Sequence, residues 1–387
     1  HALSAGLHDR DSYGPSPLND GNRDKKGFGH GAGYLYPHAY RDHWVAQQYL
    51  PGALQGQVFY QPSDQGYEAT IQAQVARRRE AQLAALVEAG GALPEVLSFS
   101  PANPGEDRWL QRAVSQAGVK VAASRDRLFD LIQPQRHHVI LDVHARSGLL
   151  TWEALRRVPE GGVYAAAYTP QAATALTEQA AQLSELSRPI VLQTALLDLP
   201  ETLHQQAPDI RFDWIVGRNT LTAIADKAAM VKAWANWLQP SGAIALIESI
   251  PQHAQRLYRL LSEEALPPDL LEAIAVAEEA IYQDANDPMV NWDGADLHTA
   301  FESAGLRAQL TVDELQTEVL ITPRLLNHWF RVPSEMGKPT YRDRLSRHLN
   351  SADLETVETA FKRQLLNQTV SWKSQIAVVR GDRLNDN

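Results

Sequence analysis

The chain has 387 residues, a length typical of two domains, and 44% of them are apolar, which is enough for a sizeable core. Its net charge of −10 argues against non-specific attraction to nucleic acid over the whole surface, but leaves a local basic patch open. The absence of cysteine excludes disulfides and thiolate metal sites and fits a cytoplasmic protein. No apolar run is long enough to span a membrane. The start at His1 in place of Met predicts that a further part of the protein precedes it.

The first ninety residues change character twice. Residues 1–33 are rich in Gly, Asp, Asn, Ser and Pro, which predicts a flexible arm. Aromatic residues crowd the stretch 34–62 without a clean period, which indicates extended segments and turns that need a partner surface. The apolar spacing then predicts a helix over 64–89 with the arginines at 77–79 on its solvated face. Together, residues 34–91 are expected to form one N-terminal segment.

A proline-rich linker is expected over 92–123, with a short helix at 109–117, and another helix is predicted at 124–133. After this, short apolar runs alternate with helical patterns. Strands are predicted at 139–143, 162–168, 190–194, 212–217 and 243–248, and helices between them at 149–157, 170–186 and 226–238. This alternation with short connections is typical of βαβ units and a parallel sheet.

Beyond residue 252 the pattern is mainly helical. Helices are predicted at 252–264, 268–282, 293–304, 322–330, 339–349 and 351–366, further strands within 306–320, and a last strand at 374–380. The fold class is therefore α/β. A Rossmann-like sheet domain with helices on both faces is predicted over 124–387, with a helical insertion at about 252–340 and helical additions toward the C-terminus.

The loop after the first predicted strand is the most informative part of this domain, because ligands of doubly wound sheets bind at the carboxyl ends of the strands. It reads Asp-Val-His-Ala-Arg-Ser-Gly from Asp142 to Gly148. This resembles the cofactor loop of the class I S-adenosylmethionine (SAM) dependent methyltransferases, with Asp142 as the acid and Gly148 as the last glycine. His144 and Arg146, the latter followed by Ser147, stand where the family has glycines that let the backbone approach the ligand. An alternative is that Arg146 faces an anion at the helix N-terminus.

Further landmarks of the same family follow in the expected order. At the end of the second strand, Ala167 stands where the family has its ribose-binding acid, and Tyr168 precedes a Thr-Pro helix start. Beyond the third strand, Ala195 stands at one position where the family often has an acid that faces the adenine, and Asp198 matches the downstream pattern. Asn219 ends a Phe-Asp-apolar fourth strand, and Leu-Gln-Pro-Ser-Gly at 238–242 matches the family's turn into the fifth. The resemblance implies SAM as a possible cofactor, held at these positions.

The N-terminal segment carries a different signature. It contains Gly-Phe-Gly-His-Gly-Ala-Gly-Tyr-Leu-Tyr-Pro-His-Ala-Tyr at 27–40, Gln-Gln-Tyr-Leu-Pro at 47–51 and Tyr-Gln-Pro-Ser-Asp-Gln-Gly-Tyr-Glu at 60–68. These runs resemble the C-terminal end of the replication-associated AAA+ ATPases of the RarA/MgsA type. The resemblance implies upstream ATPase domains that bind ATP, a homo-oligomer (a tetramer in the family) and indirect contact with DNA. This chain itself has no G-x-x-x-x-G-K-[ST] loop.

These features lead to competing hypotheses. The residues at 144, 146 and 167 favour a degenerate methyltransferase-like domain that serves as a binding or assembly module of the ATPase, with no catalytic residue assigned. The alternative is an active SAM-dependent methyltransferase acting on a protein or small molecule. A nucleic-acid binder would require a local basic patch. The histidines lack a metal-binding spacing, and Trp329 and Trp372 are expected in the core.

Overall fold

The computed structural model describes residues 66–90, 121–181, 183–331 and 340–384. The predicted arm at 1–33, the aromatic stretch at 34–62 and the short helix at 109–117 lie outside the described residues. Within the described parts, no helix is both long and apolar enough to cross a membrane. The chain divides into two compact units, one made of residues 1–138 and 144–196 and the other of residues 139–143 and 197–387.

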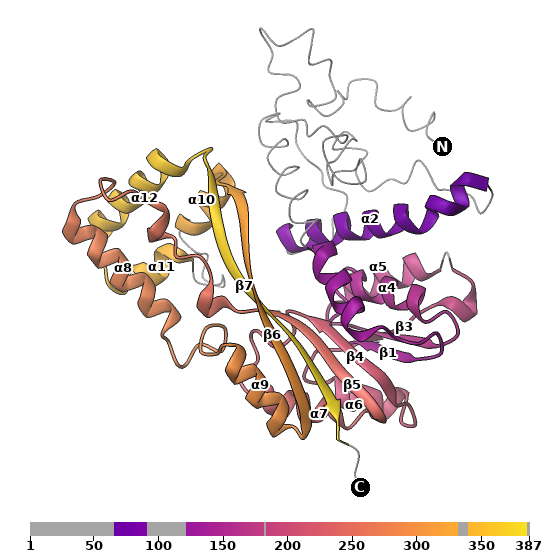
Figure 1. The fold of residues 1–387 in the computed structure, drawn as a ribbon. Helices are drawn as coiled ribbons and strands as arrows, with labels where there is room; N and C mark the ends of the chain where they lie inside the picture. The colour runs from indigo at the N-terminus through magenta and orange to yellow at the C-terminus, as the bar shows by residue number, and fades with distance from the viewer. Residues whose placement is uncertain (1–65, 91–120, 182, 332–339, 385–387) are drawn as a thin grey trace. The chain divides into compact units, whose positions relative to one another are not determined.

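Seven strands form one sheet in the order β3-β2-β1-β4-β5-β7-β6 (Figure 1). The strands are β1 (Val139–Asp142), β2 (Gly162–Ala167), β3 (Ile190–Gln193), β4 (Phe212–Arg218), β5 (Leu238–Ser249), β6 (Leu306–Leu320) and β7 (Thr369–Arg383). β1 pairs with β4, β2 with β3 and β4 with β5 in parallel, whereas β7 is antiparallel to both β5 and β6. The order runs outward from β1 in both directions, as in doubly wound sheets. The predicted α/β class with a Rossmann-like sheet is confirmed.

The first unit contains the helices that precede and follow β2. They are α2 (Gly66–Gly90), a helix over 121–132, α4 (Leu149–Arg157), α5 (Pro170–Ala180) and the 3₁₀ turn η5 (Glu185–Ser187). α4 packs on β2, and α5 packs on β2 and β3. The end of β2 is a run of three buried alanines at 165–167, which leaves room for close approach of the helices. The helix predicted at 170–186 is shorter in the structure, where α5 ends at Ala180.

One expectation for α2 is wrong. Arg77, predicted on a solvated face, lies 2.7 Å from Asp126 and 3.1 Å from the buried carboxylate of Glu153. Among the described side chains of α2, Ala81 and Ala84 are buried, and Ala84 clusters with Leu149. A charged face of α2 is therefore a packing face, because the partner surface supplies carboxylates of opposite charge.

In the second unit, α7 (Lys227–Ala235) and α9 (Gly294–Ser303) lie side by side against β5 and β6. A further helix, α6 (Leu199–Gln206), was not predicted; Asp198 is its N-cap and Pro200 lies in its first turn. Strands β5 and β7 are also longer than the predicted 243–248 and 374–380. β7 pairs with β6 along its whole length, from Arg383 to Thr369, and this pairing supplies the hydrogen bonds that extend the strand.

The predicted helix at 252–264 is wrong. The chain there forms two 3₁₀ turns, η6 (Pro251–His253) and η7 (Tyr258–Leu260). The carboxylate of Glu278 accepts hydrogen bonds from the backbone N–H groups of Leu257 and Tyr258, the latter at 2.8 Å. Because both N–H groups donate to the side chain of Glu278, they do not form the backbone hydrogen bonds of an α-helix.

A separate hydrophobic cluster joins the remaining helices. They are α8 (Pro268–Tyr282), α10 (Pro323–Phe330), α11 (Tyr341–Leu345) and α12 (Ser351–Leu365). Trp329 is buried in this cluster and packs edge-on against Phe361, with ring centroids 6.2 Å apart. Trp372 stacks on Trp329 at the same separation. The prediction of a core position is confirmed for Trp329, whereas Trp372 is partly buried and packs against this helical core, which is distinct from the cluster around β2.

Candidate functional site at the carboxyl ends of the strands

The loop that leads into α4 is shaped by one glycine. Gly148 is the N-cap of α4 and has a φ of 77°, a left-handed conformation that favours glycine. A Cβ at this position would collide with the side chains of Trp152 and Leu176. Just before it, Arg146 N–H donates to the His144 carbonyl at 2.8 Å, and Ala145 N–H donates to the Ala166 carbonyl at 2.9 Å. The loop is therefore tied to β2 and closely covered.

The two substituted positions of this loop behave differently. The imidazole of His144 stacks on the ring of Tyr168, with centroids 4.5 Å apart and an interplanar angle of 14°. Arg146 is exposed, whereas Ser147 is buried. The structure thus brings together His144 and Tyr168, two of the predicted site residues, in a contact between their own side chains.

The end of β2 is buried in a hydrophobic cluster. Ala167 is fully buried in a cluster with Ala145, Trp152 and Leu176, and its carbonyl accepts a hydrogen bond from Thr194 N–H at 3.0 Å. A carboxylate at 167 would lose its hydration, which is costly without a charged partner. The predicted Thr-Pro helix start is confirmed, because the Thr169 hydroxyl accepts from Ala172 N–H at 3.2 Å.

In the second unit, the predicted residues lie at three separate strand or helix ends. Asp142 ends β1, opposite Val216 of β4, and is 1% exposed. Asp198 is exposed and immediately precedes α6. Asn219 follows β4 with a φ of 51°, and its Oδ1 accepts hydrogen bonds from the N–H and hydroxyl of Ser249, at 2.9 and 3.0 Å. Asn219 therefore fastens the end of β4 to the end of β5.

The sequence reasoning missed Glu248, the most buried acid at this edge. It is 0% exposed and accepts hydrogen bonds from Thr220 N–H at 2.7 Å, Leu221 N–H at 3.1 Å and the Thr222 hydroxyl at 2.9 Å. Burial raises the pKa of Glu248, although these donors act in the opposite direction. An acid near the end of the apolar run Ala-Ile-Ala-Leu-Ile at 243–247 is the signal that could have revealed it.

The loop held by Glu248 is also anchored from the other side. Trp292 Nε1 donates to the Thr222 carbonyl at 3.2 Å. Lys227 Nζ donates to the Ile224 carbonyl at 2.8 Å and lies 4.8 Å from the centre of the Trp292 ring. Burial lowers the pKa of Lys227, against the attraction of Glu248 and Asp296. The loop after β4 is thus fixed by internal hydrogen bonds.

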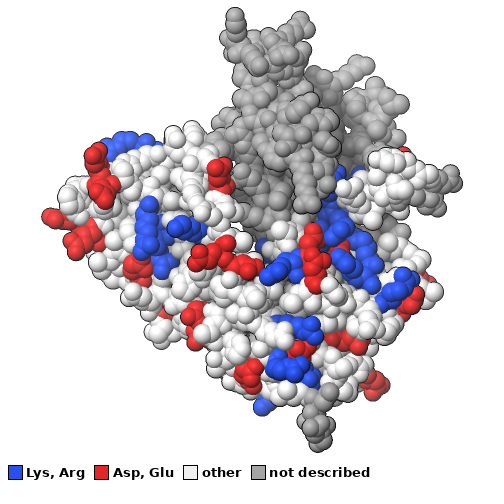
Figure 2. All heavy atoms as spheres, viewed as in Figure 1, with Lys and Arg blue, Asp and Glu red and all other residues white. Residues whose placement is uncertain are grey.

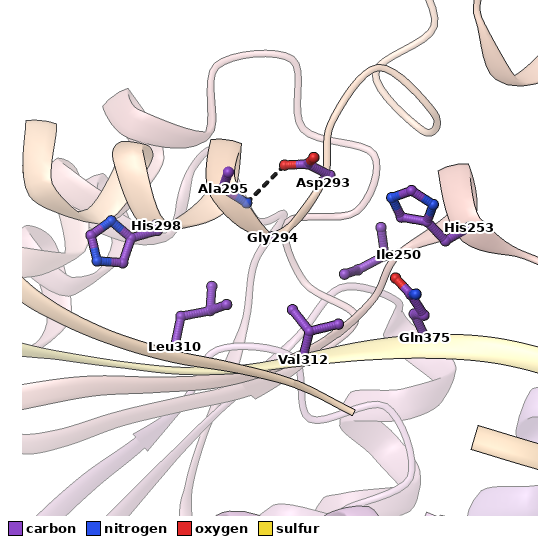
Figure 3. Close-up of a pocket in the computed structure, with 9 residues that line it drawn as sticks. All are labelled: Ile250, His253, Asp293, Gly294, Ala295, His298, Leu310, Val312 and Gln375. Atoms are coloured by element: carbon purple, nitrogen blue, oxygen red, sulfur yellow. Dashed lines mark hydrogen bonds between the residues drawn. The ribbon is translucent and has the colours of Figure 1, made fainter. Parts of the chain in front are cut away.

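A shallow pocket of about 400 Å³ opens beside α9 (Figure 3). Its lining residues are Ile250, His253, Asp293, Gly294, Ala295, His298, Leu310, Val312 and Gln375. The carboxylate of Asp293 caps the helix by accepting from Ala295 N–H at 2.7 Å and Asp296 N–H at 3.1 Å, so the helix N-terminus already holds an anion. Across the described residues, no group of three or more His, Asp or Glu could hold a metal ion.

Charge on the viewed face is mixed. Figure 2 shows Lys and Arg side chains beside Asp and Glu side chains over the described surface. Ion pairs occur among the exposed charges of the described residues, as between Arg136 and Glu160 at 2.8 Å.

The family comparison concerns the N-terminal part of the chain. Residues 3–79 match the family described as MgsA AAA+ ATPase C terminal. This segment is MgsA-like. The match ends inside α2. The chain therefore combines an MgsA-like segment with the sheet domain that follows it, as the two sequence signatures predicted. No curated protein matches the sequence.

Among solved structures, the chain is similar to several methyltransferases. A putative methyltransferase from Bacillus halodurans is 11% identical, with a TM-score of 0.39, over 67% of this chain and 99% of that one. The YcgJ protein from Bacillus subtilis is 15% identical, with a TM-score of 0.41, over 68% and 99%. A mycolic acid cyclopropane synthase is 14% identical, with a TM-score of 0.39, over 82% and 99%. Nothing about the activity of this chain follows from likenesses of this degree.

Proposed function

We propose that the sheet domain is a cytoplasmic binding or assembly module at the C-terminal end of a replication- or repair-associated AAA+ ATPase, and that it does not use SAM. The observation that carries this proposal is the stack of His144 on Tyr168. In the methyltransferase resemblance, position 144 is a glycine whose missing side chain admits the cofactor. Here position 144 carries an imidazole, and this imidazole is in contact with the ring of Tyr168.

Two further features support a loss of cofactor binding. Ala167, at the position of the ribose-binding acid, is buried in a core of small side chains, so the charge-assisted hydrogen bonds to the ribose have no acceptor. Losing such a bond costs about 1.5–3 kcal/mol if nothing replaces it. The loop after β4 is held in place by hydrogen bonds to Glu248 and from Trp292.

The remaining parts of the proposal follow from the MgsA-like segment. ATP would bind to upstream ATPase domains of the same protein, the assembly would be a homo-oligomer, and DNA would be contacted through the ATPase. The acidic balance of the chain, −10, agrees with an indirect role of this part at DNA.

The test is a thermal unfolding experiment on the full chain with SAM or S-adenosylhomocysteine. We expect no change in Tm at millimolar ligand. A bound cofactor at 100 times its Kd would add about 2.7 kcal/mol, which raises the Tm of a domain of this size by roughly 5–10 °C. A shift of that size in the wild-type chain would contradict the proposal and revive the methyltransferase alternative.

A variant with H144G and R146G provides the matched comparison. It restores the two glycines that the methyltransferase resemblance expects and removes the stack on Tyr168. If the two side chains are what excludes the cofactor, this variant should show a ligand-dependent increase in Tm that the wild-type chain lacks.

A further inference from the structure

The MgsA-like segment ends within a helix of the first unit. The family match stops at residue 79, whereas α2 runs from Gly66 to Gly90. A continuous helix of 25 residues spans roughly 37 Å and transmits displacement of one end to the other. The residues of α2 that contact α4 lie at and just beyond the end of the match.

Small side chains bring this helix close to its neighbours. Ala81 and Ala84 of α2 are each 1% exposed. Ala84 forms a cluster with Val121, in the helix over 121–132, and Leu149, at the start of α4. Such a contact buries little apolar area, so it contributes only modest free energy of its own. Other interactions must therefore hold α2 in place.

Those interactions form a network of charges that we call the Glu153 joint. Its members are Arg77 and Glu80 of α2, Arg125 and Asp126 of the helix over 121–132, and Glu153, Arg156 and Arg157 of α4. Glu153 is at its centre, with 2% of its side chain exposed. All seven residues lie in the first compact unit.

Arg77 and Arg156 each contact two carboxylates of the joint. Arg156 donates to both oxygens of Glu80, at 2.8 and 2.6 Å, and to Glu153 at 2.9 Å. Arg157 donates to the other oxygen of Glu153 at 2.9 Å. Arg77 lies 3.1 Å from Glu153, as an ion pair without the alignment of a hydrogen bond, and donates to Asp126 at 2.7 Å.

The burial of Glu153 makes these contacts interdependent. Removing one partner of a buried ion pair leaves an uncompensated charge, which costs more than the contact itself contributes. The bidentate contact of Arg156 with Glu80 also fixes the orientation of the two side chains, because the two parallel hydrogen bonds require the guanidinium and the carboxylate to lie in one plane. Rotation or sliding of α2 would break several charged contacts at once.

From this geometry we infer that the Glu153 joint locks the terminal helix of the MgsA-like segment onto α4, so that the segment's end and the sheet domain's first helix move as one body. The inference deepens the proposed assembly function and rests on it. A module attached in this way would follow the movements of an ATPase without a flexible tether between them.

Hydrogen–deuterium exchange on the full chain tests the joint. In the wild-type chain, amides of α2 near residues 77–84 should be protected. Glu153→Gln removes the central charge, and the same amides should exchange roughly tenfold faster or more. Glu160→Gln is the control, because Glu160 is 61% exposed and pairs only with Arg136 in the described structure; it should leave α2 exchange unchanged.

A second variant distinguishes local loosening of α2 from unfolding of the whole chain. Glu80→Gln breaks the contact with Arg156 from the α2 side and leaves Glu153 with Arg156 and Arg157. It should loosen α2 while exchange in β4 and β5 stays slow. The inference is overturned if α2 is unprotected in the wild-type chain, or if it stays protected in both variants. SAM binding would overturn the proposed function alone, and these exchange results would then still decide the joint.

Discussion

Glu153, Glu248 and Glu278 share an environment that is uncommon for carboxylates, since each is at most 2% exposed. Burial raises the pKa of Glu248 and Glu278, whose partners are backbone N–H and hydroxyl groups that only partly offset the loss of hydration. Burial would also raise the pKa of Glu153, but Arg156, Arg157 and Arg77 outweigh it and hold the pKa below its ordinary value. The charge of the partner thus decides the direction.

A substitution at Glu248 should reveal its role in holding the loop after β4. Glu248→Ala leaves two buried N–H groups and the Thr222 hydroxyl without their acceptor, and we expect a loss of about 3–5 kcal/mol in the free energy of unfolding. Glu248→Gln keeps one acceptor and should cost about 1–3 kcal/mol. Urea denaturation would measure both, with the exposed Glu201→Ala as control.

At the scale of elements, charged contacts join α2 to α4, and a glycine shapes the entry to α4. Among the described side chains, the contact of α2 with α4 includes Ala84 and the Glu153 joint. The entry to α4 depends on Gly148, which a side chain would force against Trp152. Gly148 constrains the start of α4, and the Glu153 joint constrains its later residues. Neither constraint can be inferred from the spacing of apolar residues.

The joint predicts a specific dependence on pH. Because the folded-state pKa of Glu153 is lowered, its contribution to stability is fully present above the unfolded pKa of about 4.3 and is lost as the pH falls through the folded value. The groups that face it are Arg77 from α2 and Arg156 and Arg157 from α4. The stability difference between wild type and Glu153→Gln should therefore shrink in urea titrations below pH 4. A difference that stays constant from pH 6 to pH 3 would contradict this.

At the scale of the whole molecule, the described chain contains more than one core. One cluster surrounds the alanines of β2 and the start of α5, and another joins α8, α10, α11 and α12. Within the helical core, the hydroxyl of Tyr341 in α11 donates a hydrogen bond to Glu278 in α8 at 2.6 Å. Helices that share one core are expected to unfold together.

Phe361 tests that expectation. It is fully buried in the helical core and contacts Trp329, Phe330 and Tyr341. Phe361→Ala should destabilise the helical core by about 3–5 kcal/mol. Hydrogen exchange should then become faster in α8, α10 and α12, while β4 and β5 keep their protection. Uniform acceleration across the sheet would show that the chain unfolds as a single unit.

Much of the fold was predictable because local rules decide it. The alternation of short apolar runs with helical patterns predicted the strands from β1 to β5 and the helices between them except α6, since each period indicates which side of an element is buried. The Thr-Pro start of α5 and the glycine at 148 follow from capping and backbone sterics. The failure at 252–264 has a distant cause, the carboxylate of Glu278.

The sequence by itself determined the α/β class and the MgsA-like signature, because propensity, period and motif are properties of neighbouring residues. Only the tertiary structure decided which charges are buried. Glu80 meets Arg156 across 76 positions, and Tyr341 meets Glu278 across 63. A charged residue is expected at the surface unless a partner compensates it, and that partner is supplied by folding. The joint that links the MgsA-like segment to the sheet domain is therefore visible in the structure and not in the sequence.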